Sequence, residues 1–214
     1  MKKSISLLFS LFLVSLLFAQ QKQYKIAAFG FYNLENFYDT INQPNVDDED
    51  FTPDGNYHYT GKIFMDKVDH LAEVVSQIAT EKTPDGLAFF GCAEIENRSV
   101  LETLVNHPKL KARNYQIVHY DGPDLRGVDC GFIYNPKYFK VLKAISYPVQ
   151  LVTDSSHKTR DILVVSGSFL GEPLTILVNH WPSRRGGEML SRANRNAAAK
   201  IARHIADSVT TANP

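Results

Sequence analysis

Three polar residues of this chain stand where apolar, strand-like runs end, namely Asn33, Glu94 and His180. Strand ends meet at a common edge of a sheet, where side chains can converge on one site. A carboxylate and an amide oxygen there can bind a hard divalent cation such as Mg²⁺. Glu94 and Asn33 are therefore candidate metal ligands. The alternatives are an acid that stabilises the first turn of the next helix, with Glu96 as a second one, and a turn residue for Asn33.

The third residue, His180, lies in the segment 179–184 (NHWPSR) with no acid nearby in sequence that could complete a nucleophilic triad. An imidazole can donate a hydrogen bond to a phosphoryl oxygen, and Arg184 can add a two-pronged one. The segment therefore predicts a phosphate contact, and the alternative is a buried His packed against Trp181. The other six histidines show no ligand spacing and are interpreted as structural or surface residues: His58, His70, His107, His119, His157 and His204.

The first half of the chain alternates strands and helices. Residues 24–32 and 87–93 have the composition of strands, and the second run is apolar enough to be buried on both faces. Between them apolar residues recur at spacings of three and four, which predicts a helix and hence a βαβ-like step. A short helix is expected at 99–106.

The second half reads as short strands in succession, the rhythm of half a β-sandwich. The expected strands are 115–120, 128–134, 139–146, 161–169 and 174–179. A final helix is expected to place one apolar face against the fold, formed by Leu190, Ala193, Ala197, Ile201 and Ile205. This order of elements favours layered α/β or α+β, with helices packed outside two sheets.

Composition and charge exclude several classes of protein. The 214 residues are 44% hydrophobic and 21% charged, which is ordinary for a folded domain and unlike disordered or coiled-coil chains. Basic and acidic residues number 23 each, so a globally basic nucleic-acid binder is excluded. Acids gather at 47–54, where the calcium-loop spacing fails and a solvated loop is expected. Bases gather at 184–203 and could form a local anion-facing surface.

Residues 1–20 have the three regions of a secretory signal peptide: Lys2 and Lys3, an apolar run over 5–18, and Ala19 before the expected cleavage point. The apolar run is too short for a membrane span. We therefore expect one domain over 21–214 in a secreted or periplasmic protein, with no stable span after removal of the leader. Cys92 and Cys130 could form a disulfide in that compartment or remain buried thiols, and the sequence leaves both readings open.

Taken in order, five motifs resemble the endonuclease/exonuclease/phosphatase family, whose members are similar to deoxyribonuclease I. They are 31–36 (FYNLEN), 90–98 (FGCAEIENR), 126–129 (RGVD), 159–163 (TRDIL) and 179–184 (NHWPSR). The resemblance runs from about residue 24 to the last and implies a four-layer α/β sandwich. It also implies that Asn33 and Glu94 bind the metal, that His180 is catalytic, and that Arg160, Asn179 and Arg184 contact substrate phosphate.

The chain departs from the family pattern near its end. The family's Gly-Asp-x-Asn and Ser-Asp-His motifs, which supply further metal ligands and the general base, do not occur in these 214 residues. We therefore expect this sequence to be the N-terminal portion of the domain, incomplete at its C-terminus. The 214 residues alone are expected to be inactive and poorly stable.

The function that the resemblance implies is an exported metal-dependent phosphodiesterase, in first place an endonuclease that uses Mg²⁺, with Mn²⁺ or Ca²⁺ as alternatives. The expected substrate is nucleic acid or another phosphodiester, and the expected state is a monomer. A phosphatase acting on inositol phosphates or lipid headgroups is the second reading. The third is a non-catalytic exported binding module, which the absent motifs permit.

Overall fold

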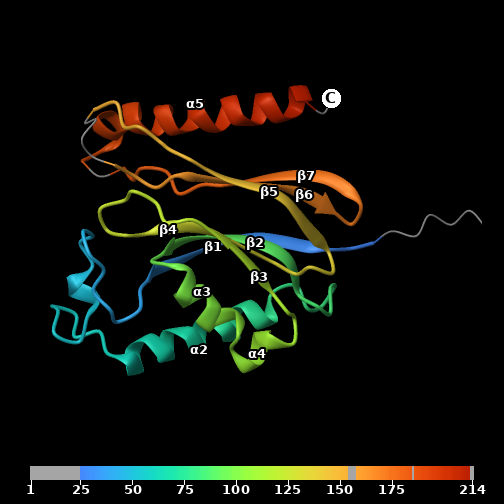
Figure 1. Cartoon of the computed structure of the whole chain (residues 1–214), viewed down its shortest axis with the longest axis horizontal. Helices are drawn as coiled ribbons and strands as arrows, with labels where there is room; N and C mark the ends of the chain where they lie inside the picture. Colours follow the sequence, from blue (N-terminus) through green and yellow to red (C-terminus); the bar gives the residue numbers. More distant parts are fainter. Residues whose placement is uncertain (1–24, 154–157, 185, 213–214) are drawn as a thin grey trace, which may run out of the picture.

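The computed structural model describes residues 25–153, 158–184 and 186–212. Its strands form two sheets that stack face to face (Figure 1). The first sheet has the order β1-β2-β4-β3 and consists of Ala28–Phe37 (β1), Leu87–Ile95 (β2), Asp129–Tyr134 (β4) and Gln116–His119 (β3). The second has the order β5-β6-β7 and consists of Phe139–Tyr147, Ile162–Phe169 and Glu172–Val178. The leader expected at residues 1–20 lies outside the described residues.

Helices cover the outer face of each sheet (Figure 1). Three lie on the first sheet, namely Gly61–Gln77 (α2), Arg98–Val105 (α3) and Pro108–Lys111 (α4), and one lies on the second, Glu188–Ala212 (α5). A short 3-10 helix, Glu49–Phe51 (η1), interrupts the acidic loop. The order helix, sheet, sheet, helix confirms the four-layer α/β sandwich. Within the described residues, no helix has the length and apolar character needed to cross a membrane.

The βαβ step is confirmed, because β1 and β2 pair in parallel and α2 connects them. Thr60 caps α2 by accepting a hydrogen bond from the Ile63 amide. The apolar face of this helix, which includes Val68 and Val75, packs with β2 into one buried cluster. The first seven of the nine residues in β2 are all buried, as expected for a strand covered on both faces.

Two of the five strands predicted in succession belong to the first sheet and not to a sandwich half. β4 pairs antiparallel with β2, with Phe90 opposite Ile133, and β3 pairs with the other edge of β4. Only β5, β6 and β7 form the second sheet. Strand spacing in the sequence does not reveal this division, since the partner of β4 lies about forty residues earlier in the chain.

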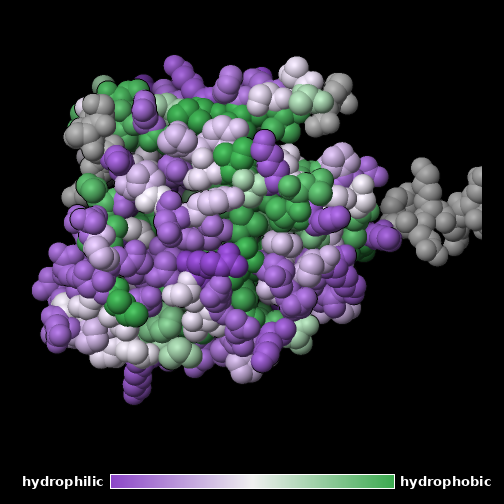
Figure 2. All heavy atoms as spheres, viewed as in Figure 1, coloured by the Kyte–Doolittle hydropathy of each residue, from purple (hydrophilic) through white to green (hydrophobic). Residues whose placement is uncertain are grey.

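The apolar face predicted for the last helix is partly wrong. Leu190 is 72% exposed, and the side chains that α5 buries are Ser191, Ala198 and Ile205. Alanines occur on several sides of this helix, so the pattern alone does not fix its rotation. Ser191 is tolerated inside because its hydroxyl donates to the Gly187 carbonyl at 2.7 Å. Figure 2 shows a hydrophilic outer surface on α5 and hydrophobic side chains beneath it.

The two cysteines are both free and buried. Cys92 packs in the cluster between the first sheet and its helices, whereas Cys130 packs between the two sheets. The thiols therefore lie on opposite faces of one sheet and do not pair. Burial raises the pKa of each thiol, which keeps both protonated at neutral pH.

We predict that Gly167→Ala destabilises the second sheet. A Cβ at this position of β6 would overlap the Lys140 carbonyl oxygen and lie 2.7 Å from the Phe139 ring. Backbone cannot move aside cheaply, so the free energy of unfolding should fall by about 1–3 kcal/mol. Gly61→Ala is the matched control, since nothing lies within 4 Å of its added Cβ at the start of α2. Urea unfolding measures both, and equal stability of the two variants would contradict the expectation.

Candidate active site at the strand ends

Two neighbouring strands of the first sheet end in irregular backbone. Asn33 lies opposite Ala93, and regular pairing then breaks between Asn33 and Phe37 on β1 and between Ala93 and Ile95 on β2. The strand expected to end at Asn33 therefore continues past a bulge. Left-handed backbone marks both breaks, with φ of 52° at Glu35, 56° at Asn36 and 58° at Glu94. Such conformations are costly for residues with a Cβ and cluster at functional sites.

Side-chain contacts hold the two bulges together. The Asn36 amide donates to Glu94 Oε2 at 3.0 Å. From α2, Lys67 Nζ donates to the carbonyl oxygens of Glu35 and Asn36, the second at 3.1 Å. Burial lowers the pKa of Lys67, against the opposing effect of Glu35 and Glu94. The orientation of Glu94 is therefore fixed by the backbone of the neighbouring strand.

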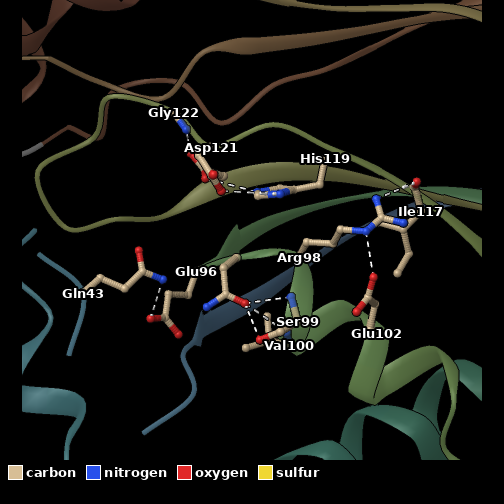
Figure 3. Close-up of polar contacts among 12 residues, drawn as sticks. Gln43, Glu96, Arg98, Ser99, Val100, Glu102, Ile117, His119, Asp121 and Gly122 are labelled. Carbon is tan, nitrogen blue, oxygen red and sulfur yellow. Dashed lines mark hydrogen bonds and ion pairs between the residues drawn. The ribbon is translucent and has the colours of Figure 1, made fainter. Parts of the chain in front are cut away.

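The helix-entry reading of Glu94 is wrong. Helix α3 is capped by Asn97, whose Oδ1 accepts from the Ser99 amide at 2.8 Å and from the Val100 amide at 3.2 Å (Figure 3). Glu96 does not cap it either, because its carboxylate accepts from the Asp39 amide and from Gln43 Nε2. Burial raises the pKa of Glu96 to about 7. Glu94 is thus available for another role.

His180 reaches Glu94 because the two sheets approach closely at Gly91. A Cβ on Gly91 would lie 3.0 Å from a methyl group of Val178, the last residue of β7. Two residues further on, His180 Nε2 lies 3.4 Å from Glu94 Oε1, and the side chains are 21% and 17% exposed. The acid partner that is missing near His180 in the sequence therefore comes from β2.

The surroundings of His180 favour a neutral imidazole. Burial lowers its pKa, the nearby Arg160 guanidinium lowers it further, and Glu94 opposes both. Its Nδ1 atom is buried and has no hydrogen-bond partner among the described residues. A neutral ring that presents Nε2–H toward Glu94 leaves Nδ1 as an unprotonated acceptor. This tautomer can donate a hydrogen bond from Nε2 at the cavity.

Arg160 lies beside His180 but is engaged with protein atoms. Its Nε donates to the His180 carbonyl at 3.2 Å and its Nη2 to the Trp181 carbonyl at 3.1 Å. Its Nη1 donates to Asp124 Oδ2 at 3.0 Å. A guanidinium has five N–H donors, so two remain for a substrate oxygen. The phosphate contact that was expected of Arg160 can therefore use only the two remaining N–H donors.

These side chains line a cavity of about 620 Å³ with polar and apolar walls. Its polar walls include Asp47, Glu94, Asp124, Arg126, Thr159, Arg160 and His180, and its apolar walls include Leu125, Leu151, Pro182 and Leu190. Of the residues predicted from the sequence, the structure brings Glu94, Arg160 and His180 together here.

Three other predicted site residues do not line this cavity. The Asn33 side chain accepts a hydrogen bond from the Glu35 amide at 2.9 Å. The Asn179 side chain donates to the Leu177 carbonyl and accepts from Trp181 Nε1, which fixes the turn after β7. Arg184 is exposed beside the cavity residue Ser183. Asn179 therefore acts on local structure in this arrangement, because both ends of its amide are used.

The Glu94 carboxylate fits a hard divalent cation. Each of its oxygens has one protein contact, to Asn36 N or to His180 Nε2, and a carboxylate oxygen can accept more than one. Asn33 lies opposite Ala93 on β1, but its Oδ1 accepts from the Glu35 amide and it does not line the cavity. Carboxylate oxygens suit Mg²⁺, Mn²⁺ or Ca²⁺. Of the two ligands predicted from the sequence, Glu94 therefore fits a metal ion at the end of β2.

A second group with metal-ligand chemistry consists of His119, Asp121 and Asp129, of which Figure 3 labels His119 and Asp121. His119 Nε2 lies 3.1 Å from Asp129 Oδ2, and the other Asp129 oxygen accepts from the Gly122 amide at 3.0 Å. These contacts close the base of the loop between β3 and β4. They support the structural reading of His119.

The acidic loop is solvated only in part. Asp47, Glu49 and Asp54 are exposed as expected, but Asp48 is buried. Its Oδ2 accepts from the Gln43 amide at 3.0 Å, and burial raises its pKa. The sequence prediction failed for Asp48 because the loop folds back on itself at Gln43, whose side chain in turn donates to Glu96, and charge clustering does not reveal such contacts.

We predict that His180 titrates below the ordinary histidine pKa of about 6.5. The folded state then binds fewer protons than the unfolded state as the pH falls through about 6.5, so the free energy of unfolding decreases on acidification. His180→Gln removes this contribution, and the stability difference between the unaltered chain and the variant should shrink on acidification. An NMR titration of the His180 ring measures the pKa directly. A midpoint at or above 6.5 would contradict the prediction.

The chain is similar in fold to several solved structures. TDP2 from Caenorhabditis elegans shares 16% sequence identity, with a TM-score of 0.50 over 72% of this chain and 41% of that one. An endonuclease/exonuclease/phosphatase from Bacteroides vulgatus shares 14% identity, with a TM-score of 0.47 over 84% of this chain and 59% of that one. A search of curated protein sequences finds no match.

The chain spans about half of the length of the first solved structures that it resembles, between 40% and 51%. At these identities the likeness to TDP2 from C. elegans shows the fold. A family profile covers almost the whole described chain, from residue 28 to residue 214. The chain belongs to the Endonuclease/Exonuclease/phosphatase family.

Proposed function

We propose that this protein is an exported, metal-dependent phosphodiesterase and, within that class, an endonuclease. The observation that carries the proposal is the pair formed by Glu94 and His180, which come from different sheets and lie 3.4 Å apart at one cavity. Membership of the family supports hydrolysis of a phosphate ester. Export rests on residues 1–20 alone, and a mature protein that still begins at Met1 would contradict it.

In this proposal Glu94 and Asn33 bind the divalent cation, with Mg²⁺ as the first candidate. A bound Mg²⁺ supplies Lewis-acid polarisation of a phosphate oxygen. His180 donates its Nε2–H to a phosphoryl oxygen, where negative charge grows in the transition state. Arg160, through its two remaining N–H donors, and the exposed Arg184 add positive charge on the same side, and Asn179 fixes the turn that carries His180.

Among the residues that the structure describes, no side chain at the cavity is evident as the general base for water. His180 is oriented toward Glu94, and the family motifs that carry an Asp and a His for this step are absent from the 214 residues. We therefore propose that these residues bind metal and phosphate but do not turn over by themselves. Hydrolysis of DNA by the 214-residue chain would overturn this part of the proposal.

We predict that Glu94→Gln weakens metal binding. Loss of an outer partner of a metal ligand typically costs about 10–100-fold in affinity, and loss of a ligand charge should cost at least as much. Electron paramagnetic resonance of Mn²⁺ measures the affinity without any need for turnover. Glu102→Gln is the matched control, because Glu102 is exposed and pairs with Arg98 on α3. Unchanged Mn²⁺ affinity in Glu94→Gln, or no binding by the unaltered chain, would remove the metal assignment.

The salt dependence of binding distinguishes a nucleic-acid substrate from an inositol phosphate or lipid headgroup. Nucleic acid releases counterions when it binds, so the affinity for DNA should fall steeply, by about 10³-fold or more between 50 and 200 mM salt for six or more phosphate contacts. A single inositol phosphate or lipid headgroup should show a much smaller change. Fluorescence anisotropy of the 214-residue chain with labelled DNA and with a labelled headgroup makes the comparison. A shallow salt dependence would favour the phosphatase reading.

The cavity supports an enzyme more than a binding module. A non-catalytic surface has no need of a half-buried His beside a half-buried carboxylate, since partial removal from water is unfavourable for both groups. The same binding assay separates the two readings. A binding module should bind its ligand equally after Asn33→Ala and His180→Ala, whereas both substitutions should weaken phosphate binding at a catalytic site.

A further inference from the structure

Asp124 is a buried carboxylate that the sequence motifs do not single out. It lies in the loop between β3 and β4, and it is 5% exposed. Its Oδ1 accepts from the Arg126 amide at 3.1 Å, which orients the carboxylate within its own loop. Its Oδ2 accepts from Arg160 Nη1 at 3.0 Å. Asp124 therefore connects this loop to the strand region of the second sheet.

The loop that carries Asp124 is itself held at several points. The Leu125 carbonyl accepts from the Asp47 amide at 2.7 Å, and the Arg126 carbonyl accepts from the Tyr38 hydroxyl at 2.6 Å. Gly127 adopts a left-handed φ of 64° and packs against Val46. These contacts join the loop to β1 and to the acidic loop. Asp124 is thus presented from a fixed backbone.

The Arg160 guanidinium, which donates a hydrogen bond to Asp124, also holds the turn after β7. Arg160 uses Nε for the His180 carbonyl and Nη2 for the Trp181 carbonyl, while Nη1 faces Asp124. Arg160 is only 11% exposed, so its orientation depends on these three acceptors. The two carbonyls carry no net charge, so among the described residues Asp124 is the one anionic group to which the Arg160 guanidinium donates, and Asp124 Oδ1 also lies 3.5 Å from Arg126 Nε. Removal of the carboxylate would leave a buried cation without its counter-ion.

We propose that Asp124 is a positioning residue for the active site. It fixes Arg160, and Arg160 fixes the backbone of His180 and Trp181, so that the imidazole faces Glu94. The chain of contacts runs from the β3–β4 loop to the end of β7, two segments that are far apart in sequence. The catalytic role of His180 rests on the proposed function. The hydrogen bonds by which Arg160 holds the turn after β7 do not depend on it.

The test uses Trp181, which is the only tryptophan in the chain and therefore reports on this turn alone. In Asp124→Asn the amide no longer neutralises Arg160, and the turn should loosen. We expect the Trp181 emission to shift to longer wavelength and its quenching by acrylamide to increase in the 214-residue chain. Asp85→Asn is the matched control, since Asp85 pairs with Lys137 elsewhere on the surface. It should leave both signals unchanged.

A second variant keeps the test decisive if Asp124→Asn fails to fold. Asp124→Asn combined with Arg160→Met removes both charges, so no buried cation is left unpaired. This double variant should fold by circular dichroism and still show the red shift and the stronger quenching of Trp181. Unchanged Trp181 emission and quenching in either folded variant would overturn the positioning role.

Turnover of DNA by the complete protein carrying Asp124→Asn separates this role from direct phosphate binding. A misplaced His180 should lower kcat by roughly 100-fold with little change in KM, as displacement of a catalytic group does. Arg160 keeps its two remaining N–H donors for phosphate in Asp124→Asn, so a rise in KM without a fall in kcat in that variant would contradict the positioning role. Loss of Mn²⁺ binding in Glu94→Gln tests the proposed function separately, because that result does not depend on Asp124.

Discussion

The close approach of the two sheets at Gly91 is the constraint on which the site depends. Val178 occupies the space that a side chain at position 91 of β2 would need, and this brings the end of β7 over the end of β2. His180 and Glu94 are neighbours only because of that approach. A larger residue at position 91 would separate the sheets at the place where both strands deliver their polar side chains, since packed interiors have little free space.

Burial then determines the chemistry of these groups. Glu94, His180, Arg160 and Asp124 are all largely withdrawn from water, and each has a partner of complementary charge or hydrogen-bonding character. Water would screen such contacts to a small fraction of their strength. The same burial lowers the pKa of His180 and keeps its ring neutral. A neutral ring between a carboxylate and a guanidinium is suited to donating one hydrogen bond in a fixed direction.

The sequence predicted the features that depend on local pattern. The βαβ step, the outer helices and the polar residues close to the ends of β2 and β7, Glu94 and His180, follow from local pattern and are present, whereas β1 continues past Asn33 to Phe37. The sheet to which β3 and β4 belong and the Asp124–Arg160 contact were missed, because each depends on pairing between distant segments. Asp124 follows a turn-forming Pro and looks like an ordinary loop acid. Its contact with the site is visible only in the structure, where Arg160 Nη1 lies 3.0 Å from Asp124 Oδ2.

The backbone at the site is held in conformations that an isolated strand would avoid. Glu35, Asn36 and Glu94 are all left-handed, at a cost of about 1–3 kcal/mol each. Lys67 offsets part of this cost by binding the carbonyls of the β1 bulge, and Glu94 offsets another part by accepting the Asn36 amide. The strain is useful only if the direction of the Glu94 carboxylate matters. Leu170, in the turn directly after β6, is also left-handed, so strain by itself does not mark a function. At Glu94 it fixes the direction of a carboxylate, which is what a metal ligand would need.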